Sequence, residues 1–267
     1  MLITSRDNAT VKEIRSLRTR KAREETGLYF IEGVRMVAEA IDAGADIETI
    51  VVCQELLNKY ADELQRFQDR VQRAEAVPHL DVSAKVFESI AEYATSEGIG
   101  AVVCERWEQM ENVRLSDELC WIAVNSIQNP SNLGTLLRIS DAVGGRGLIL
   151  IGNCTDPYHP IAVRASLGAV FSQSVVRASF AELAAWKRRH GYRMVGTSPT
   201  APLDYRSVTY EPPFTLFLGN EWFGLTEEQQ QLCDLLVKIP MAGRIESHNV
   251  AVAAGIVLYE ALGQRGV

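Results

Sequence analysis

Short apolar runs alternate with helical segments throughout the second half of this 267-residue chain. The runs that favour strands stand at 120–124, 147–151, 174–178, 192–197, 215–218 and 235–239. The segments that favour helices stand near 132–144, 159–170, 179–190, 226–232 and 248–262. Apolar strands separated by helices are typical of a parallel sheet covered on both faces. Because ligands bind such sheets beyond the carboxyl ends of the strands, we expect the site in the segments that follow them.

The first half shows a second, smaller alternation. Strands are expected at 27–33, 47–53 and 99–104, and helices at 34–43, near 55–72 and near 83–93. This order predicts a small three-layer α/β domain. Residues 105–118 are polar and weakly periodic, as a linker would be. We therefore expect an N-terminal domain at 1–104, a linker at 105–118 and a C-terminal domain at 119–267.

Composition excludes several classes of protein. With 47% hydrophobic and 23% charged residues, the chain is expected to be a soluble globular protein. No apolar stretch approaches the ~20 residues that cross a bilayer, and the N-terminus lacks the apolar region of a signal peptide. We therefore expect a cytoplasmic protein without a membrane partner. The five cysteines are widely spaced and odd in number, which argues against disulfides and a structural zinc.

The net charge of −7 taken alone argues against binding of nucleic acid, but the inference depends on where along the chain the charges lie. Residues 1–23 carry a balance of +5, residues 24–105 a balance of −11, and the remainder is close to neutral. Val11, Ile14 and Leu17 recur at helical spacing, so an amphipathic helix would bury them and turn basic side chains outward. The candidate RNA-binding residues of this arm are Arg6, Lys12, Arg15, Arg18, Arg20, Lys21 and Arg23. A merely solvated basic helix face is the alternative.

Three segments that follow strands carry unusual polar residues. The first, 125–138, is a turn-rich loop that leads into a helix, where Ser131 or Asn132 can cap the N-terminus. Backbone N–H groups there could face an anion, and Arg138, nearly two turns after Asn132, could reach the same place. An ordinary capped helix with a surface arginine is the alternative.

The second segment, 217–225, places Gly219 directly after an apolar strand and Glu221 among aromatic residues. The third, 239–249, is a glycine-bearing loop that ends where a small-residue helix begins near Asn249. Ser247 or His248 could contact a ligand there, or be ordinary surface residues. The phosphate-binding fingerprints G-x-G-x-x-G and G-x-x-x-x-G-K-[ST] and the G-x-S-x-G elbow are absent, which weakens NAD, ATP and hydrolase interpretations.

In this order the segments resemble the TrmH/SpoU branch of the SPOUT RNA 2′-O-ribose methyltransferases. The three family motifs look like 132–138, 218–225 and 239–250, and 156–158 with 164–171 look like the segment between the first two. The stretch that begins with residues 3–8 and ends with residues 32–33 is similar to the L30e-type RNA-binding domain that many family members carry.

The resemblance implies a C-terminal α/β domain with a parallel sheet and a deep trefoil knot, preceded by the small L30e-like domain. It implies S-adenosylmethionine as cofactor, RNA as partner, a homodimer through the C-terminal domain, and no metal. A two-domain layout resembles ribosomal RNA modifiers more than the single-domain transfer RNA enzymes.

The resemblance also implies roles for particular residues. Arg138 would be the catalytic arginine, and Asn132, Glu221, Ser247 and Asn249 would shape the site and the subunit interface. The cofactor would be contacted by the backbone at Gly219, Ile239 and His248, with Thr197, Leu218 and Met241 beside it. The chain departs from the family at three positions: His248 replaces a usual Leu, Ala251 a second Ser, and Trp222 a common Gly.

The leading hypothesis is an S-adenosylmethionine-dependent enzyme that methylates a ribose 2′-OH of structured RNA, with ribosomal RNA as the expected substrate. A ribose hydroxyl is a very weak acid, so the reaction needs a base or a group that stabilises the alkoxide. Arginine is a poor base, so we favour phosphate positioning and electrostatic help from Arg138. The alternative, motivated by His248 and Ala251, is a catalytically inactive RNA-binding protein of the same fold that acts in ribosome assembly.

Overall fold

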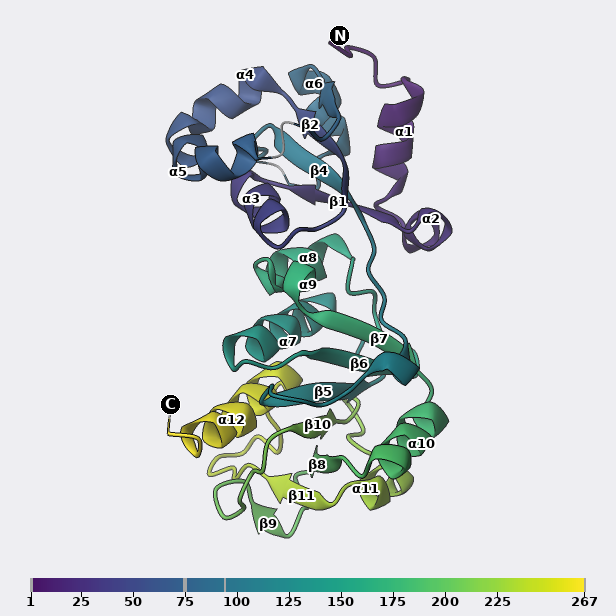
Figure 1. The fold of residues 1–267 in the computed structure, drawn as a ribbon, viewed down its shortest axis with the longest axis vertical. Helices are drawn as coiled ribbons and strands as arrows, with labels where there is room; N and C mark the ends of the chain where they lie inside the picture. The colour runs from purple at the N-terminus through teal and green to yellow at the C-terminus, as the bar shows by residue number, and fades with distance from the viewer. Residues whose placement is uncertain (1, 74–75, 94, 267) are drawn as a thin grey trace. The chain divides into compact units, whose positions relative to one another are not determined.

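The computed structural model describes residues 2–73, 76–93 and 95–266 (Figure 1). The chain divides into two compact units. The first unit comprises Met1–Glu105 and Tyr158–Phe171, and the second comprises Arg106–Pro157 and Ser172–Val267. The chain thus passes from the second unit into the first for one short segment and then returns. The domain boundaries expected from the sequence stay a prediction.

A four-stranded sheet in the order β1-β4-β2-β3 forms the centre of the first unit. Its strands are β1 (Leu28–Glu32), β2 (Ile47–Val52), β3 (His79–Asp81) and β4 (Ile99–Cys104). β4 pairs antiparallel with β1 and with β2, whereas β2 and β3 are parallel. β3 was not expected, because three residues, two of them exposed, are too few to show a strand period.

Helices cover both faces of this sheet, which confirms the expected three layers. They are α1 (Ala9–Ser16), α2 (Arg20–Thr26), α3 (Val34–Asp42), α4 (Gln54–Leu57), α5 (Ala61–Gln72), α6 (Ala84–Ile90), α8 (Pro160–Ser166) and most of α9 (Ala169–Ser172). Figure 1 shows α3 and α5 on one face and α1 and α6 on the other. The helix expected near 55–72 is interrupted by a 3-10 turn at Asn58–Tyr60, and the one at 159–170 breaks at Leu167, whose φ is +50°.

The arm at the start of the chain buries the face that its spacing predicts. Val11, Ile14 and Leu17 are all buried and pack with Phe87 of α6. The helix nevertheless stops at Ser16, because the Thr19 hydroxyl accepts a hydrogen bond from Ala22 N at 3.3 Å and starts a second helix.

Arg23 is a correction to the expected exposed arm. Its side chain is only 1% exposed. Its Nη1 donates to the carbonyl oxygens of Leu17 at 2.7 Å and Arg18 at 3.1 Å, in the corner between α1 and α2. Carbonyls that follow a helix lack helical partners, so the guanidinium satisfies them. Arg23 therefore holds this corner together instead of presenting its charge to RNA.

A seven-stranded sheet in the order β7-β6-β5-β10-β8-β11-β9 forms the second unit. Its strands are β5 (Cys120–Asn125), β6 (Gly147–Ile151), β7 (Ser174–Ala178), β8 (Arg193–Thr197), β9 (Leu203–Asp204), β10 (Phe214–Leu218) and β11 (Leu235–Lys238). Every neighbouring pair is parallel, which confirms the expected parallel sheet. The two-residue β9 was not expected, and the trefoil knot stays a prediction.

Helices cover both faces of this sheet, and its central strands are buried on both sides. The helices are α7 (Pro130–Ala142), α10 (Phe180–His190), α11 (Glu227–Leu232) and α12 (Val250–Gly263), with a 3-10 turn at Met110–Asn112. Trp121 and Ala123 pack in one cluster with Trp186 of α10. Because side chains alternate along a strand, Ile122 and Val124 point to the other face, and both are fully buried. Figure 1 shows α7 and α12 along that side. No helix among the described residues is long and apolar enough to span a membrane.

Replacing Arg23 tests its structural role. Arg23→Ala should lower the free energy of unfolding by about 2 kcal/mol, because charge-assisted hydrogen bonds to two carbonyls are lost. Urea unfolding followed by circular dichroism measures the change. Arg20→Ala is the matched control, because Arg20 forms an exposed i,i+4 ion pair with Glu24 that is worth less than about 0.5 kcal/mol. Equal unfolding midpoints for the two variants would contradict the role of Arg23.

Candidate active site

The carboxyl ends of four neighbouring strands meet at one edge of the large sheet. β5, β10, β8 and β11 are adjacent and parallel, with Leu218 opposite Val124 and Val237 opposite Thr197. Thr197, Leu218 and Gly219 therefore lie at or just beyond the same edge, as does Ile239 directly after β11. The parallel register thus brings together segments that stand far apart in the sequence.

The helix that follows β5 starts earlier than the sequence suggested. The N-cap of α7 is Asn129, whose Oδ1 accepts a hydrogen bond from Ser131 N at 2.9 Å, and Pro130 fills the first turn. The expected caps, Ser131 and Asn132, are therefore wrong, because proline with its fixed φ favours the first helical position. As a consequence, the Asn132 amide is available for contacts outside its own helix.

Polar side chains from all three unusual segments join in one hydrogen-bond network. The Glu221 carboxylate accepts a hydrogen bond from Gln128 N at 3.1 Å and another from Asn132 Nδ2. Asn132 Oδ1 accepts in turn from Asn249 Nδ2 at 2.9 Å. Asn249 also caps α12, since its Oδ1 accepts from Ala251 N at 3.0 Å. Three of the five expected catalytic residues are thus in direct contact.

The loop after β10 is built tightly. Asn220 N and Gly224 O lie 3.0 Å apart, and Gly224 N and Asn220 O lie 2.9 Å apart, so two hydrogen bonds close it. Asn220 Nδ2 also donates to Ser126 O at 3.0 Å, which ties the loop to the end of β5. A Cβ on Gly219 would stand 2.1 Å from the carbonyl carbon of Gly224, so only glycine permits this approach.

Three expected residues lie outside the network. Arg138 is exposed, and its side chain makes no hydrogen bond or ion pair with any residue that the structure describes. It lies six residues after Asn132, which is about 9 Å along α7. Ser247 and His248 are exposed in the loop before α12, and their side chains have no polar partner among the described residues.

The loop before α12 leaves main-chain groups available to a ligand. No backbone hydrogen bond between described residues involves 241–248. Such N–H and C=O groups can read the edge of a purine ring, as recognition of S-adenosylmethionine requires. Gly219, Thr197 and the half-buried Ile239 and Met241 supply neighbouring main chain and apolar surface. The residues at this edge therefore fit such a cofactor.

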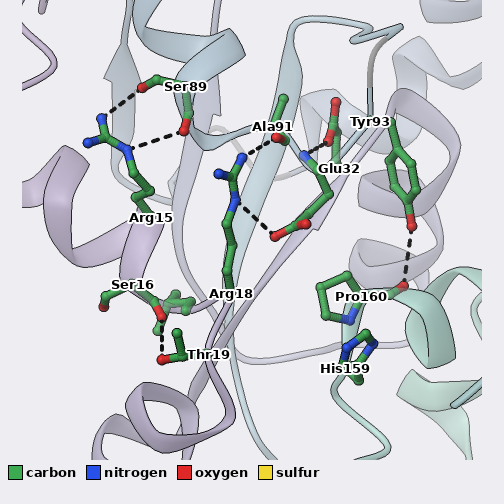
Figure 2. Close-up of polar contacts among 12 residues, drawn as sticks. Arg15, Ser16, Arg18, Thr19, Glu32, Ser89, Ala91, Tyr93, His159 and Pro160 are labelled. Atoms are coloured by element: carbon green, nitrogen blue, oxygen red, sulfur yellow. Dashed lines mark hydrogen bonds and ion pairs between the residues drawn. The ribbon is translucent and has the colours of Figure 1, made fainter.

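Two arginines of the N-terminal arm hold the arm against the C-terminal end of α6, in the same unit (Figure 2). Arg15 donates to the Ser89 carbonyl at 3.2 Å and to the Ser89 hydroxyl at 2.8 Å. Arg18 donates to the Ala91 carbonyl and forms an ion pair with Glu92 at 3.1 Å. Both carbonyls lie at the C-terminal end of α6, where orphan oxygens and the helix dipole favour cations. These arginines therefore have a packing role that the basic pattern did not reveal.

Residues 158–171 carry an aromatic and cationic cluster within the first unit. Tyr93 Oη donates to the Pro160 carbonyl at 3.4 Å, as Figure 2 shows. The Arg164 guanidinium lies 4.1 Å from the centre of the Tyr93 ring. Tyr29 packs on Tyr158 with ring centres 4.7 Å apart, and burial raises the pKa of Tyr29 well above its ordinary value. These contacts anchor the segment.

Two residues of the site were not predicted from the sequence. Asn220 shapes the loop after β10, because its Oδ1 accepts from Trp222 N at 2.9 Å and Phe223 N at 3.3 Å. An asparagine beside a glycine is a turn signal that could have identified it. Gln128 contributes only its backbone N–H to Glu221, a group that nearly every residue type offers, so no signal marks it.

Among the described residues, no group of three or more His, Cys, Asp or Glu side chains is arranged to hold a metal ion.

Two known protein families match this chain, one in each half of the sequence. Residues 120–259 match the SpoU rRNA Methylase family, and residues 8–101 match the MRM3-like substrate binding domain.

Similar proteins span nearly the whole chain. A 23S rRNA (uridine(2479)-2′-O)-methyltransferase of Streptomyces viridochromogenes is 33% identical, over 98% of this chain and 92% of its own. The 23S rRNA (guanosine(2553)-2′-O)-methyltransferase RlmP of Bacillus subtilis is 28% identical, over 98% and 99%. The structure of an AdoMet-bound rRNA methyltransferase from Sinorhizobium meliloti superposes with a TM-score of 0.87 at 32% identity, over 100% of this chain and 98% of that one.

The close approach at Gly219 yields a prediction. Gly219→Ala should displace the loop after β10, because the added Cβ meets main-chain atoms that cannot move aside. Trp222 lies in this loop and is 83% exposed, so acrylamide quenching of tryptophan fluorescence should report the displacement. Gly263→Ala is the control, since nothing lies within 4 Å of a Cβ there. If Gly219→Ala matches that control in fluorescence quenching and stability, the contact between Gly219 and the main chain of Gly224 does not require glycine.

Proposed function

Because the chain belongs to the SpoU rRNA methylase family, we propose that it transfers the methyl group of S-adenosylmethionine to a ribose 2′-OH of ribosomal RNA. The observation that carries this proposal is the Glu221–Asn132–Asn249 network, which joins the three motif segments at the carboxyl edge of the sheet. The relatives that methylate 23S rRNA are matched over 92% and 99% of their lengths. We therefore take 23S rRNA as the substrate.

The cofactor supplies a methyl group that its sulfonium charge already activates. In our proposal, main-chain groups at Gly219, Ile239 and His248 hold its adenosine, and Leu218 and Met241 line its surroundings with Thr197. The departure of His248 from the usual leucine leaves a main-chain contact intact. Ser247 lies next to His248 in the loop before α12 and would contact the cofactor or the ribose. No metal is needed, because no leaving group has to be polarised.

Arg138 is proposed as the catalytic arginine. Because arginine is a cation and a poor general base, the exposed Arg138 side chain would act through its charge. A cation there would hold the phosphate next to the target ribose and stabilise the developing alkoxide. The Glu221–Asn132 pair would keep the start of α7 fixed while RNA binds.

The first unit is proposed to hold the RNA. The substrate-binding family that it matches supports this assignment, and so do the exposed basic residues of its arm. The candidate contacts are now Arg6, Lys12, Arg20 and Lys21, with Arg15 and Arg18 contributing from beside α6. Phosphate contacts of this kind weaken as salt concentration rises.

A homodimer through the C-terminal part is also proposed. Val252 and Tyr259 of α12 are 50% and 55% exposed. They are seven residues apart, so they form one apolar stripe on the same helix face. The stripe begins one turn from Asn249, so a second copy packed there would lie close to the network.

The function is tested by mapping 2′-O-methyl groups on 23S rRNA from cells with and without the protein. Loss of one methyl group without the protein, and its return on complementation, is the expected result. Calorimetric titration with S-adenosylmethionine separates the enzyme from an inactive RNA-binding protein, because the latter has no need to hold the cofactor. An unchanged methylation map would refute the proposed function.

Arg138→Ala should reduce kcat for methyl transfer at least about a hundredfold, because the cation that stabilises transition-state charge is removed. Calorimetry and circular dichroism should show unchanged cofactor affinity and fold, since Arg138 has no polar partner among the described residues. Arg146→Ala, at the opposite end of the sheet before β6, is the matched control. Near-normal turnover of Arg138→Ala would remove Arg138 from the mechanism.

Tyr259→Asp should convert a dimer into monomers in sedimentation experiments, because a charge would enter the apolar stripe. Ile161→Asp provides the control: Ile161 is 49% exposed on α8 in the first unit, and a charge there should leave the dimer intact. A Tyr259→Asp protein that sediments as the parent does would place the interface elsewhere.

A further inference from the structure

We propose that Trp222 and Phe223 form a stacking platform for an unpaired RNA base beside the methylated ribose. The inference rests on the proposed function and deepens it, since it concerns how the substrate is recognised. Trp222 is 83% exposed and Phe223 is 91% exposed. Two neighbouring aromatic side chains with this exposure leave their ring faces available to a partner.

The backbone that carries the two aromatic side chains is held in place without a partner. The backbone N–H groups of Trp222 and Phe223 both donate to Asn220 Oδ1, at 2.9 Å and 3.3 Å. Paired hydrogen bonds between Asn220 and Gly224 close the loop on either side of the aromatic residues. Because the backbone is already ordered, little entropy is lost when a base stacks, which favours binding.

The platform also adjoins the proposed site. Glu221, the residue directly before Trp222, bonds to Gln128 N and to Asn132. The aromatic pair is thus attached to the network that joins the three motif segments. A nucleotide stacked there would have its ribose and phosphate close to those segments, where the methyl transfer is proposed to occur.

The surroundings favour RNA over a protein partner. Gln128, Asn129 and Ser131 are exposed on the adjoining loop and helix start. The core of a protein interface is poor in such polar groups, whereas single-stranded RNA is bound by aromatic faces set among polar and basic side chains. Since each base has a π-face, the platform would accept any base and orient it. The ribose, in contrast, would be read by the neighbouring polar groups.

The first test measures stacking directly, without cofactor or turnover. A single-stranded oligoribonucleotide carrying one 2-aminopurine is titrated with the full chain, because stacking on an aromatic ring quenches 2-aminopurine emission. Trp222→Ala should weaken the apparent Kd about tenfold, within the range known for base–aromatic stacking. Trp222→Tyr should restore most of the affinity, because it keeps a ring. No quenching by the parent protein, or the same curve for Trp222→Ala, would overturn the proposal.

The second test uses unmethylated 23S rRNA. Trp222→Ala should raise KM for the RNA about tenfold while the calorimetric Kd for S-adenosylmethionine stays unchanged. Leu203→Ala, which shortens an exposed apolar side chain on β9, should leave KM unchanged. If the parent protein methylates the RNA and Trp222→Ala has the same KM, the platform is refuted and the proposed function stands. If the parent protein does not methylate the RNA, the proposed function itself fails.

Sedimentation distinguishes the other possible occupant of the platform, a second copy of the chain. Trp222→Ala should sediment as the parent does. Dissociation of this variant into monomers would overturn the inference, because it would assign the aromatic pair to an interface between copies.

Discussion

The site depends on one constraint, the parallel register of the large sheet. β5, β10, β8 and β11 lie side by side and run in the same direction, so their carboxyl ends share one edge. Each strand there is followed by an irregular segment. Glu221 and Asn249 lie in two of these segments, and Asn132 lies in the first turn of the helix that follows a third. An antiparallel partner in this row would send its following loop to the opposite edge and leave the network incomplete.

Much of this arrangement could be predicted from the sequence. Apolar runs marked the central strands of the large sheet, because strands buried on both faces need few polar residues. Two-residue β9 and three-residue β3 are too short for any period to show. The partners of the polar side chains could not be predicted either. Glu221 meets the backbone of Gln128 across 93 positions of the chain, and no side-chain pattern encodes that meeting.

The basic arm at residues 1–23 also shows that a sequence does not reveal the partners of its polar side chains. Its charges were visible, but their partners were not. Arg15 and Arg18 bond to carbonyls 74 and 73 residues away, at the end of α6, and Arg23 is buried in a helix corner. A cation that satisfies orphan carbonyls and a cation that awaits phosphate look identical in a sequence. The distinction depends on which helix end folds next to the arginine.

Asn249 performs two tasks with the two ends of one amide. Its oxygen caps α12, and its nitrogen donates to Asn132. Serine, threonine and aspartate cap helices about as well, but none of them can both accept the backbone hydrogens and offer an NH₂ group. Selection for helix stability alone would therefore tolerate several residue types at this position, whereas an intact site tolerates one. Unwinding of the first turn of α12 would also break the hydrogen bond to Asn132. The site is therefore ordered only while the start of this helix is folded.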